Sequence, residues 1–249
     1  MIIPPWTASR PRLSESPQRT QGPGKRSEGS TSVHEAERLQ DELKESVVRT
    51  SAPIEPPRTV TGLDVTYDTG SDRAVAAAVV VDVASLEVVE VAFHRGEATF
   101  PYVPGLLAFR EVPLLVAAIE RLSTPPALLV CDGYGLAHPK RFGLASHLGV
   151  VLDLPSYGVA KTAFVGEFTP PAEQRGAHAD LTDAGEVIGS VVRTQTAVKP
   201  VFVSAGHRIG LDDCVSLTLR LSGRHRIPEP TRQADIESRK MLREWRSLE

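Results

Sequence analysis

The pattern of apolar and polar positions divides the chain into two unequal parts. Residues 1–32 are rich in Pro, Ser, Gly, Arg and Gln and have almost no periodic apolar content. Such a segment cannot bury enough apolar surface to offset the entropy lost on ordering. We therefore expect a disordered N-terminal extension at 1–32 and a single folded domain at 33–249.

A leucine stripe predicts the first helix of that domain. Leu39, Leu43 and Val47 recur at a spacing of four and fall on one helical face. Ser32 has the character of an N-cap, and Glu35 stands where a capping box has its acid.

The remaining periodicity predicts a mixed α/β sheet. Residues 60–67, 74–83 and 88–93 are predicted as three strands of an antiparallel meander, which continues into alternating helices and strands. Further strands are predicted at 128–131, 150–154, 187–193 and 201–204, and helices before residue 122 and at 211–221 and 230–245. The polar segment 169–185, which carries Pro and Gly, is predicted to be an exposed loop.

Composition adds mainly exclusions. The chain has 249 residues, 41% of them apolar, which is enough for one full core. Its formal net charge of −3 excludes a uniformly basic nucleic-acid binder, although not a local basic face. Cys131 and Cys214 are too few for a disulfide framework. No apolar run reaches the length of a membrane span and no apolar leader begins the chain, so we expect a cytoplasmic protein without membrane contact.

Three acids stand where a carboxylate is costly unless it is used. Asp64 lies in the middle of the strand predicted at 60–67, and Glu111 lies on the apolar stripe of the helix that follows the meander. Asp132 directly follows the strand at 128–131, at the carboxyl end where open α/β sheets bind ligands. Each acid taken alone is explained more simply as a paired, capping or border carboxylate.

Taken together, the three acids indicate a metal site. Hard oxygen ligands from several elements suit Mg²⁺ or Mn²⁺, which take few protein carboxylates and keep water molecules for the substrate. Such a metal orients and activates a water and neutralises charge on a phosphate. The pattern therefore predicts metal-dependent phosphate chemistry at one end of the sheet.

Several motifs carry a resemblance to a known family. They are TGLDVTYD at 61–68, FPYVPGLLAFRE at 100–111, DGYGLAHPKRFGLASHLG at 132–149, LPSYGVAK at 154–161, VSAGHRI at 203–209 and PEPTRQAD at 228–235. In these motifs the chain resembles endonuclease V, a family of metal-dependent nucleases that act at deoxyinosine, the product of adenine deamination. The resemblance extends over residues 33 to 240.

The resemblance implies a fold and a reaction. The fold would be ribonuclease H-like: a mixed five-stranded sheet, with its first three strands antiparallel, flanked by helices. The reaction would be hydrolysis of the second phosphodiester on the 3′ side of deoxyinosine, in the repair of deaminated adenine. It would leave a 3′-hydroxyl and a 5′-phosphate and would use Mg²⁺, with Mn²⁺ as a substitute.

The resemblance also implies roles for single residues. Asp64, Glu111 and Asp132 would be the metal carboxylates. Asp235, in TRQAD, takes the place of a fourth polar residue near the metal, one that varies in the family. Lys161, in GVAK, would be the lysine near the scissile phosphate, where a protonated amine stabilises developing charge or positions a water.

The loop FPYVP has two possible roles. Pro101 and Pro104 bracket Tyr102 and Val103, which makes the loop stiff and extended. On spacing alone, a packed connecting turn explains it equally well. The resemblance favours a wedge that is inserted where the lesion base leaves the helical stack.

The stretch after Asp132 is predicted to read the base. Gly133 and Gly135 permit close backbone approach, so amides there are candidates to hydrogen-bond an extruded hypoxanthine, with His138 beside them. Lys140 and Arg141 follow in the same stretch, which is a candidate for phosphate chemistry. A second basic cluster comprises Arg220, Arg224, His225 and Arg226. Such runs are by default solvated faces, but the segment 220–226 contains no carboxylate, so we expect it to help bind phosphates. For His207, a place near the phosphates and a purely structural role both stay open.

Two other functions compete with a monomeric nuclease for inosine-containing DNA. The first is the same chemistry on inosine-containing RNA or on single-stranded nucleic acid, because the sequence shows no legible contact to a ribose 2′-hydroxyl. The second is a non-catalytic nucleic-acid-binding module on the same fold. That second function predicts a missing carboxylate, and all three are present.

Overall fold

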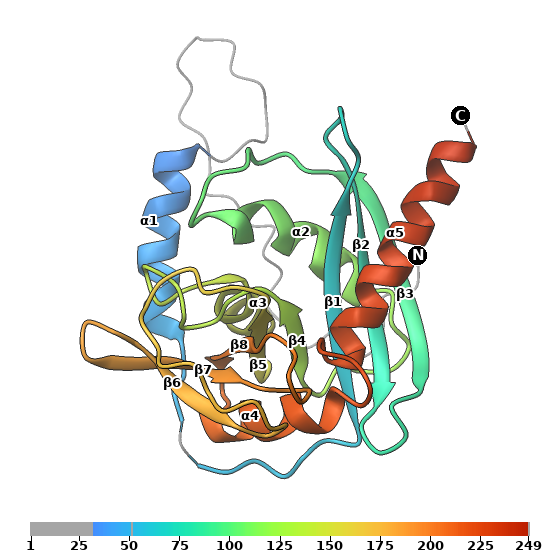
Figure 1. Ribbon diagram of the computed structural model, residues 1–249. Coiled ribbons are helices and arrows are strands. Elements are labelled where there is room, and N and C mark those ends of the chain that lie inside the picture. The colour runs from blue at the N-terminus through green and yellow to red at the C-terminus, as the bar shows by residue number, and fades with distance from the viewer. Residues whose placement is uncertain (1–31, 51, 249) are drawn as a thin grey trace.

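A computed structural model describes residues 32–50 and 52–248. The described chain folds around one eight-stranded mixed sheet in the order β3-β2-β1-β4-β5-β8-β7-β6 (Figure 1). The predicted disordered extension lies outside the described residues except for Ser32, which caps the first helix through its hydroxyl oxygen. The predicted domain boundary therefore stays a prediction.

The ribonuclease H-like core is the first five strands of this sheet. β1 (Thr59–Tyr67), β2 (Arg73–Asp82) and β3 (Val88–Glu97) form the antiparallel meander, and β4 (Leu129–Asp132) and β5 (Ser156–Ala160) continue it in parallel with β1. The predicted fold class is confirmed. The sheet is wider than the predicted five strands because β8 (Val201–His207), β7 (Glu186–Val192) and β6 (His178–Asp183) extend it beyond β5 in antiparallel pairs.

Helices cover both faces of the sheet. α2 (Leu107–Ile119) and α3 (Leu144–Leu152) pack on one face, and α4 (Leu211–Leu221) and α5 (Glu229–Ser247) pack on the other. α1 (Val33–Leu43), which continues as a short 3₁₀ turn (Lys44–Ser46), packs beside the loop that precedes α2. None of the described helices is long and apolar enough to cross a membrane.

The central strands are buried on both faces, and their small side chains let the helices approach closely. One side of β2 contacts the α2–α3 layer through Ala74, Ala76, Ala78 and Val80, and the other side contacts α5 through Ala77, Val79 and Val81. On β1, Gly62 lies so close to the start of α5 that an added Cβ would stand 2.1 Å from the carbonyl carbon of Pro230. This packing fixes α5 against β1, the strand that carries Asp64.

Two sequence predictions were wrong. Of residues 150–154, predicted as a strand, residues 150–152 form the end of α3, and the strand comes later as β5. Asp153 ends α3 in the left-handed conformation (φ 51°), so Pro155 precedes the strand instead of closing it. The predicted loop at 169–185 contains β6, an edge strand with one buried side chain, which therefore gave no apolar alternation.

His147, buried in α3, generates a prediction about stability. Its ring lies between Phe109 and Phe142, with ring centroids 4.9 Å and 5.1 Å away, and its Nδ1 has no hydrogen-bond partner. Burial lowers the pKa of His147 to about 4. In the unfolded chain this histidine takes up a proton near its ordinary pKa of about 6.5, whereas the folded chain resists protonation until about pH 4. The neutral ring therefore contributes its full share to the free energy of unfolding above pH 6.5, and that share is lost as the pH falls toward 4.

We expect His147→Phe to reduce this acid sensitivity. Between pH 7.5 and pH 5, the free energy of unfolding of the variant should fall by about 2 kcal/mol less than that of the wild type. Urea unfolding at the two pH values measures the difference. His34→Phe, on the exposed side of α1, is the matched control. Parallel losses in wild type and His147→Phe would contradict the assignment.

Candidate active site

Two of the predicted acids lie on neighbouring parallel strands, Asp64 within β1 and Asp132 at the end of β4. Leu63 of β1 is in parallel register with Cys131 of β4, so Asp64 and Asp132 are the next residues along neighbouring strands. Glu111 reaches the same region from the middle of α2, where burial raises its pKa and the charges of Asp64 and Asp132 add to that rise. The three residues thus lie within electrostatic reach of one another.

Asp64 is held by hydroxyl groups. Ser238, on α5, donates a hydrogen bond of 2.8 Å to Asp64 Oδ2, and Thr66 Oγ1 lies 2.6 Å from the same serine oxygen. Burial raises the pKa of Asp64 to about 6, and the charges of Asp132 and Asp235 add to the rise while the Ser238 hydrogen bond opposes it. The carboxyl group therefore remains partly protonated near neutral pH.

Glu111 is the most deeply buried of the three acids. It is 8% exposed and accepts a 3.2 Å hydrogen bond from the Tyr67 hydroxyl. Burial, followed by the charge of Asp64, raises its pKa to about 8. The Arg110 guanidinium lies over the Tyr67 ring, 4.7 Å from its centroid, and holds that ring in place.

Asp132 is paired with the predicted lysine. Lys161 directly follows β5, which runs parallel to β4, and its Nζ lies 2.6 Å from Asp132 Oδ2. Burial lowers the pKa of Lys161, but the hydrogen bond with Asp132 and the charges of the other acids outweigh it and raise that pKa above its ordinary value. Lys161 is therefore a permanent cation at this site.

Asp235 lies on α5 at the edge of the same group. Its Oδ1 accepts a 2.7 Å hydrogen bond from Arg239 Nε, one turn further along the helix. Its charge contributes to the raised pKa values of Asp64 and Lys161, which places it within electrostatic reach of both.

The donors fit a hard divalent cation. Among residues 32–50 and 52–248, no three Asp, Glu, His or Cys side chains already form a metal-binding cluster. The pKa values of Asp64 and Glu111 are nevertheless raised by burial and by mutual repulsion, and a nearby cation relieves both. Oxygen ligands of this kind suit Mg²⁺ or Mn²⁺.

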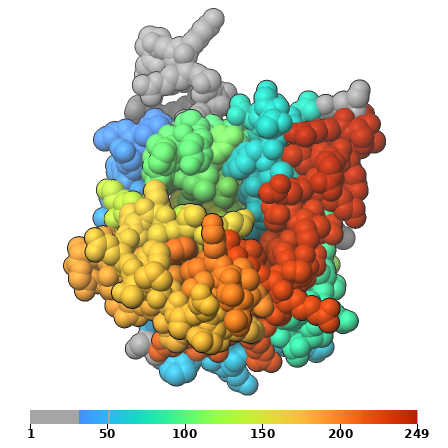
Figure 2. All heavy atoms as spheres, viewed as in Figure 1, coloured from blue at the N-terminus to red at the C-terminus, as the bar shows by residue number. Residues whose placement is uncertain are grey.

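A cavity of about 350 Å³ opens beside Asp132 and Lys161. Four of the residues predicted to bind substrate line it: Tyr102, Pro104, Gly133 and His138. The cavity thus joins the proline loop, the glycine turn and the charged pair in one space. In Figure 2, α1 (blue), the region around residue 105 (green) and the segments after β5 (yellow) border one another on the face shown.

The proline loop divides between exposed and anchored residues. Tyr102 is 71% exposed, and Pro101 and Pro104 are exposed beside it. Val103 instead points inward and packs against the cluster formed by Ala36, Phe100 and Leu106. Of the four residues predicted for the wedge, Pro101 and Val103 do not line the cavity.

His138 is a buried neutral ring. Its Nδ1 accepts a 3.1 Å hydrogen bond from the Lys140 amide, and the ring also hydrogen-bonds the backbone of Gly105. Burial lowers the pKa of His138 to about 4. The ring is consequently an uncharged part of the cavity wall. It packs edge-on against the Phe164 ring, with 5.5 Å between the two ring centroids.

Gly135 does not offer the amide that was predicted for it. Its N–H donates 2.9 Å to Ser204 Oγ, and Gly135 is absent from the cavity lining, whereas Gly133 is part of it. An added Cβ at Gly135 would stand 2.1 Å from the Ala205 carbonyl oxygen. A close approach between the turn and β8 therefore explains this glycine.

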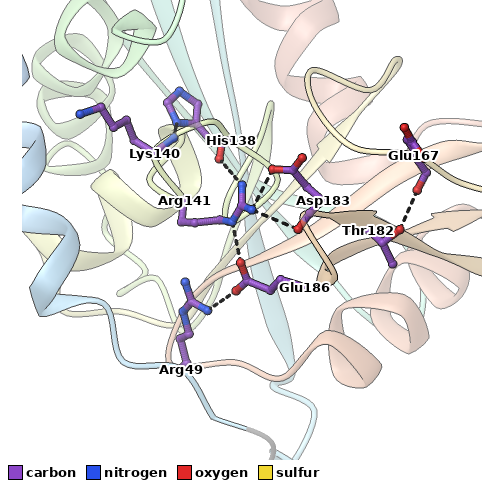
Figure 3. A network of polar contacts seen from close by, with 8 residues as sticks. All are labelled: Arg49, His138, Lys140, Arg141, Glu167, Thr182, Asp183 and Glu186. Atoms are coloured by element: carbon purple, nitrogen blue, oxygen red, sulfur yellow. Dashed lines mark hydrogen bonds and ion pairs between the residues drawn. The ribbon is translucent and has the colours of Figure 1, made fainter.

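Arg141 is not a free phosphate contact (Figure 3). Its guanidinium donates 2.8 Å to Asp183 Oδ2, 2.7 Å to Glu186 Oε2 and 3.1 Å to the His138 carbonyl. Glu186 also accepts from Arg49 at 2.6 Å. The network connects the β6–β7 turn to the segment that carries His138, so Arg141 has a structural role.

His207 lies outside the site. Its Nδ1 accepts a 3.2 Å hydrogen bond from the Val48 amide, and the Arg208 amide donates 2.8 Å to the Val48 carbonyl. His207 therefore holds the segment after α1 against the end of β8. Of the two roles left open for it, this contact supports the structural one.

Sequence reasoning missed part of the cavity wall. Leu107, Tyr134, Phe142, Leu144, Thr162 and Phe164 line it as well, and the rings of Tyr134 and Phe164 pack 5.4 Å apart. Phe164 carried one available signal, because it stands three residues after Lys161 in an otherwise small-residue loop.

Comparison with known proteins is consistent with this geometry. The family model for endonuclease V matches residues 41–236. Endonuclease V of Streptomyces avermitilis is 53% identical over 212 residues, which are 84% of this chain and 92% of the relative. Its crystal structure superposes with a TM-score of 0.82 at 52% identity, covering 87% of this chain and 95% of that one.

A more distant structure contains nucleic acid. Endonuclease V of Ciona intestinalis, in complex with a 24mer DNA containing an inosine followed by a ribo-adenosine, is 27% identical with a TM-score of 0.74. The match covers 85% of this chain and 98% of that one. With the family model matching most of its length and a relative 53% identical over 84% of the chain, the chain belongs to the endonuclease V family.

Proposed function

We propose that this protein is a metal-dependent endonuclease that nicks DNA at the second phosphodiester 3′ to deoxyinosine. One observation carries the proposal: a single cavity is lined both by Asp132 and Lys161 and by the proline loop and His138. Its volume of about 350 Å³ lies within the usual range for small-molecule sites. The Ciona complex with inosine-containing DNA supports the choice of base.

Each half of the site has its own task. Tyr102 would enter the duplex as the lesion base leaves the stack, and Gly133 and His138 would border the extruded base. Extrusion costs a few kcal/mol, least at a weak pair, which favours inosine over an undamaged base. Asp64, Glu111 and Asp132 would hold Mg²⁺ or Mn²⁺, with Asp235 as a further candidate, and the metal would supply an activated water and charge neutralisation.

Lys161 contributes charge in place of proton transfer. Its raised pKa keeps it protonated, so it cannot act as a base at neutral pH. A cation held beside Asp132 instead stabilises negative charge that develops on a phosphate oxygen. The family's nuclease chemistry argues against a non-catalytic binding module, as does the presence of all three carboxylates and of Lys161.

Inosine-containing RNA is a second candidate substrate. The nucleotide after the inosine in the Ciona complex is a ribo-adenosine, which places a 2′-hydroxyl next to the lesion. We expect the DNA substrate to be preferred. Competition between matched DNA and RNA oligonucleotides at equal concentration gives the ratio of kcat/KM values, and a ratio in favour of RNA would reassign the substrate.

The proposal predicts a metal-dependent nick that requires Asp64. Purified protein with Mg²⁺ should nick an inosine-containing duplex at the second phosphodiester 3′ to the inosine, and EDTA should abolish the nick. Asp64→Asn should lower kcat by at least roughly a thousandfold, because the metal contributes several kcal/mol to the transition state. A denaturing gel of the labelled strand measures both.

Asp180→Asn is the matched control for this experiment. Asp180 is an exposed acid on the edge strand β6, so the same chemical change there should leave cleavage unaltered. Circular dichroism establishes that both variants are folded. Cleavage by folded Asp64→Asn at the wild-type rate would remove Asp64 from the site, and the absence of cleavage by folded wild type would refute the function.

Lys161→Met should separate catalysis from metal binding. Removing the ammonium group should lower kcat roughly a hundredfold, as loss of one electrostatic stabiliser does. Because Lys161 is the cation paired with Asp132 at 2.6 Å, its removal should leave divalent-ion affinity unchanged or higher. Isothermal titration with Mg²⁺ measures the affinity, with Lys240→Met on α5 as control. A parallel loss of affinity and kcat would indicate a structural role.

A further inference from the structure

The proline loop and the wall of the cavity meet at a buried glutamine of α1. Gln40 is 2% exposed, and its Nε2 donates 2.8 Å to the Gly105 carbonyl and 3.3 Å to the Phe142 carbonyl. Gly105 ends the proline loop, and Phe142 belongs to the turn after β4. Both residues line the cavity, so one side chain connects its two sides.

The Gly105 carbonyl is a junction of two donors. It accepts from Gln40 on one side, and the ring of His138 hydrogen-bonds the same backbone group. Gly105 itself is in the left-handed region (φ 85°), where a side chain would be strained. The direction in which the loop enters α2 is therefore set at this residue.

Other contacts of α1 support the same loop and turn. Ala36, fully buried one turn before Gln40, packs with Phe100 and Leu106 on either side of the proline loop. Asp41, the residue after Gln40, accepts from Lys140 Nζ at 3.0 Å and 3.1 Å. α1 thus contacts both the loop that carries Tyr102 and the turn that carries His138.

The chemistry of the contact requires an amide. The –NH₂ group of glutamine has two N–H donors, one for each carbonyl, and no hydrocarbon or carboxylate side chain of this length supplies them. Replacement by an apolar side chain would leave two buried carbonyls without their present partner. The loop and the turn would then lose their common support.

We propose that Gln40 is a positioning residue for lesion recognition, which holds the Tyr102 loop at a fixed distance from the cavity that receives the base. This inference rests on the proposed function. Its consequence is specific to the duplex: there the base has to be extruded while Tyr102 fills the gap, whereas in single-stranded DNA the base is already free of a partner. Gln40 should therefore matter more for duplex than for single-stranded substrate.

The test measures kcat/KM of Gln40→Met on inosine-containing duplex and single-stranded DNA. Methionine keeps the length and flexibility of the side chain and removes the donors. We expect a loss of about tenfold on the duplex and less than about twofold on the single strand. In a double-mutant cycle, Tyr102→Ala should cost much less in the Gln40→Met background than in the wild type.

Gln195→Met is the matched control. The Gln195 amide also bridges backbone carbonyls, those of Ser222, Gly223 and His225 at 3.0 Å each, in the loop between α4 and α5. The same substitution there should leave the ratio of duplex to single-strand activity unchanged. Gln40→Asn, one methylene shorter with both donors retained, replaces Gln40→Met if the latter does not fold, and it should lower the same ratio by a smaller factor.

The outcomes separate this inference from the function on which it rests. Equal losses on the two substrates, tracking a fall in Tm, would make Gln40 a purely structural residue and overturn the proposal. Additive losses in the cycle with Tyr102→Ala would do the same. If the wild type nicks neither substrate, the proposed function fails and not merely the role of Gln40.

Discussion

The burial of acidic side chains where β1 runs beside the end of β4 is the constraint on which the rest of the structure depends. A buried carboxylate is expensive unless it is hydrogen-bonded, paired or bound to a metal. The chain gives Asp64 a serine hydroxyl from α5, Glu111 a phenol from β1, and Asp132 the ammonium of Lys161. The neutral donors of the first two acids do not offset their burial, which raises both pKa values, and a bound cation would relieve that penalty.

The packing of the core follows from placing these partners. Ser238 reaches Asp64 only because α5 lies close to β1, and that closeness needs Gly62 and the small side chains of β2. On the other face, α2 brings Glu111 over the sheet, and Pro113 lies inside the helix without ending it. The alanines of β2 are thus as much a part of the site as the acids, because larger residues would separate the helices from the strand ends.

The sequence was sufficient where the signal is local and insufficient where it depends on distant partners. Asp64, Glu111 and Asp132 could be found because an acid within an apolar strand or stripe is anomalous in its own neighbourhood. The end of α3 was mistaken for a strand because VVLDL is apolar in either conformation, and the left-handed Asp153 that separates helix from strand leaves no mark in composition. Gln40 resembled any polar helix residue, since its partners are 65 and 102 positions away.

The distribution of charge around the cavity separates recognition from affinity. Each of the cations Lys140, Arg141 and Lys161 faces a carboxylate, and His138 is held neutral by burial. A wall built from the Asp132–Lys161 pair, a neutral histidine and the rings of Tyr134, Phe142 and Phe164 exerts little net field on its contents. In the proposed reaction the occupant is an uncharged purine, so shape, stacking and hydrogen bonds have to select it. The charge of the phosphate would then be neutralised by the metal and Lys161. A base that does not enter the cavity never places its phosphodiester beside them.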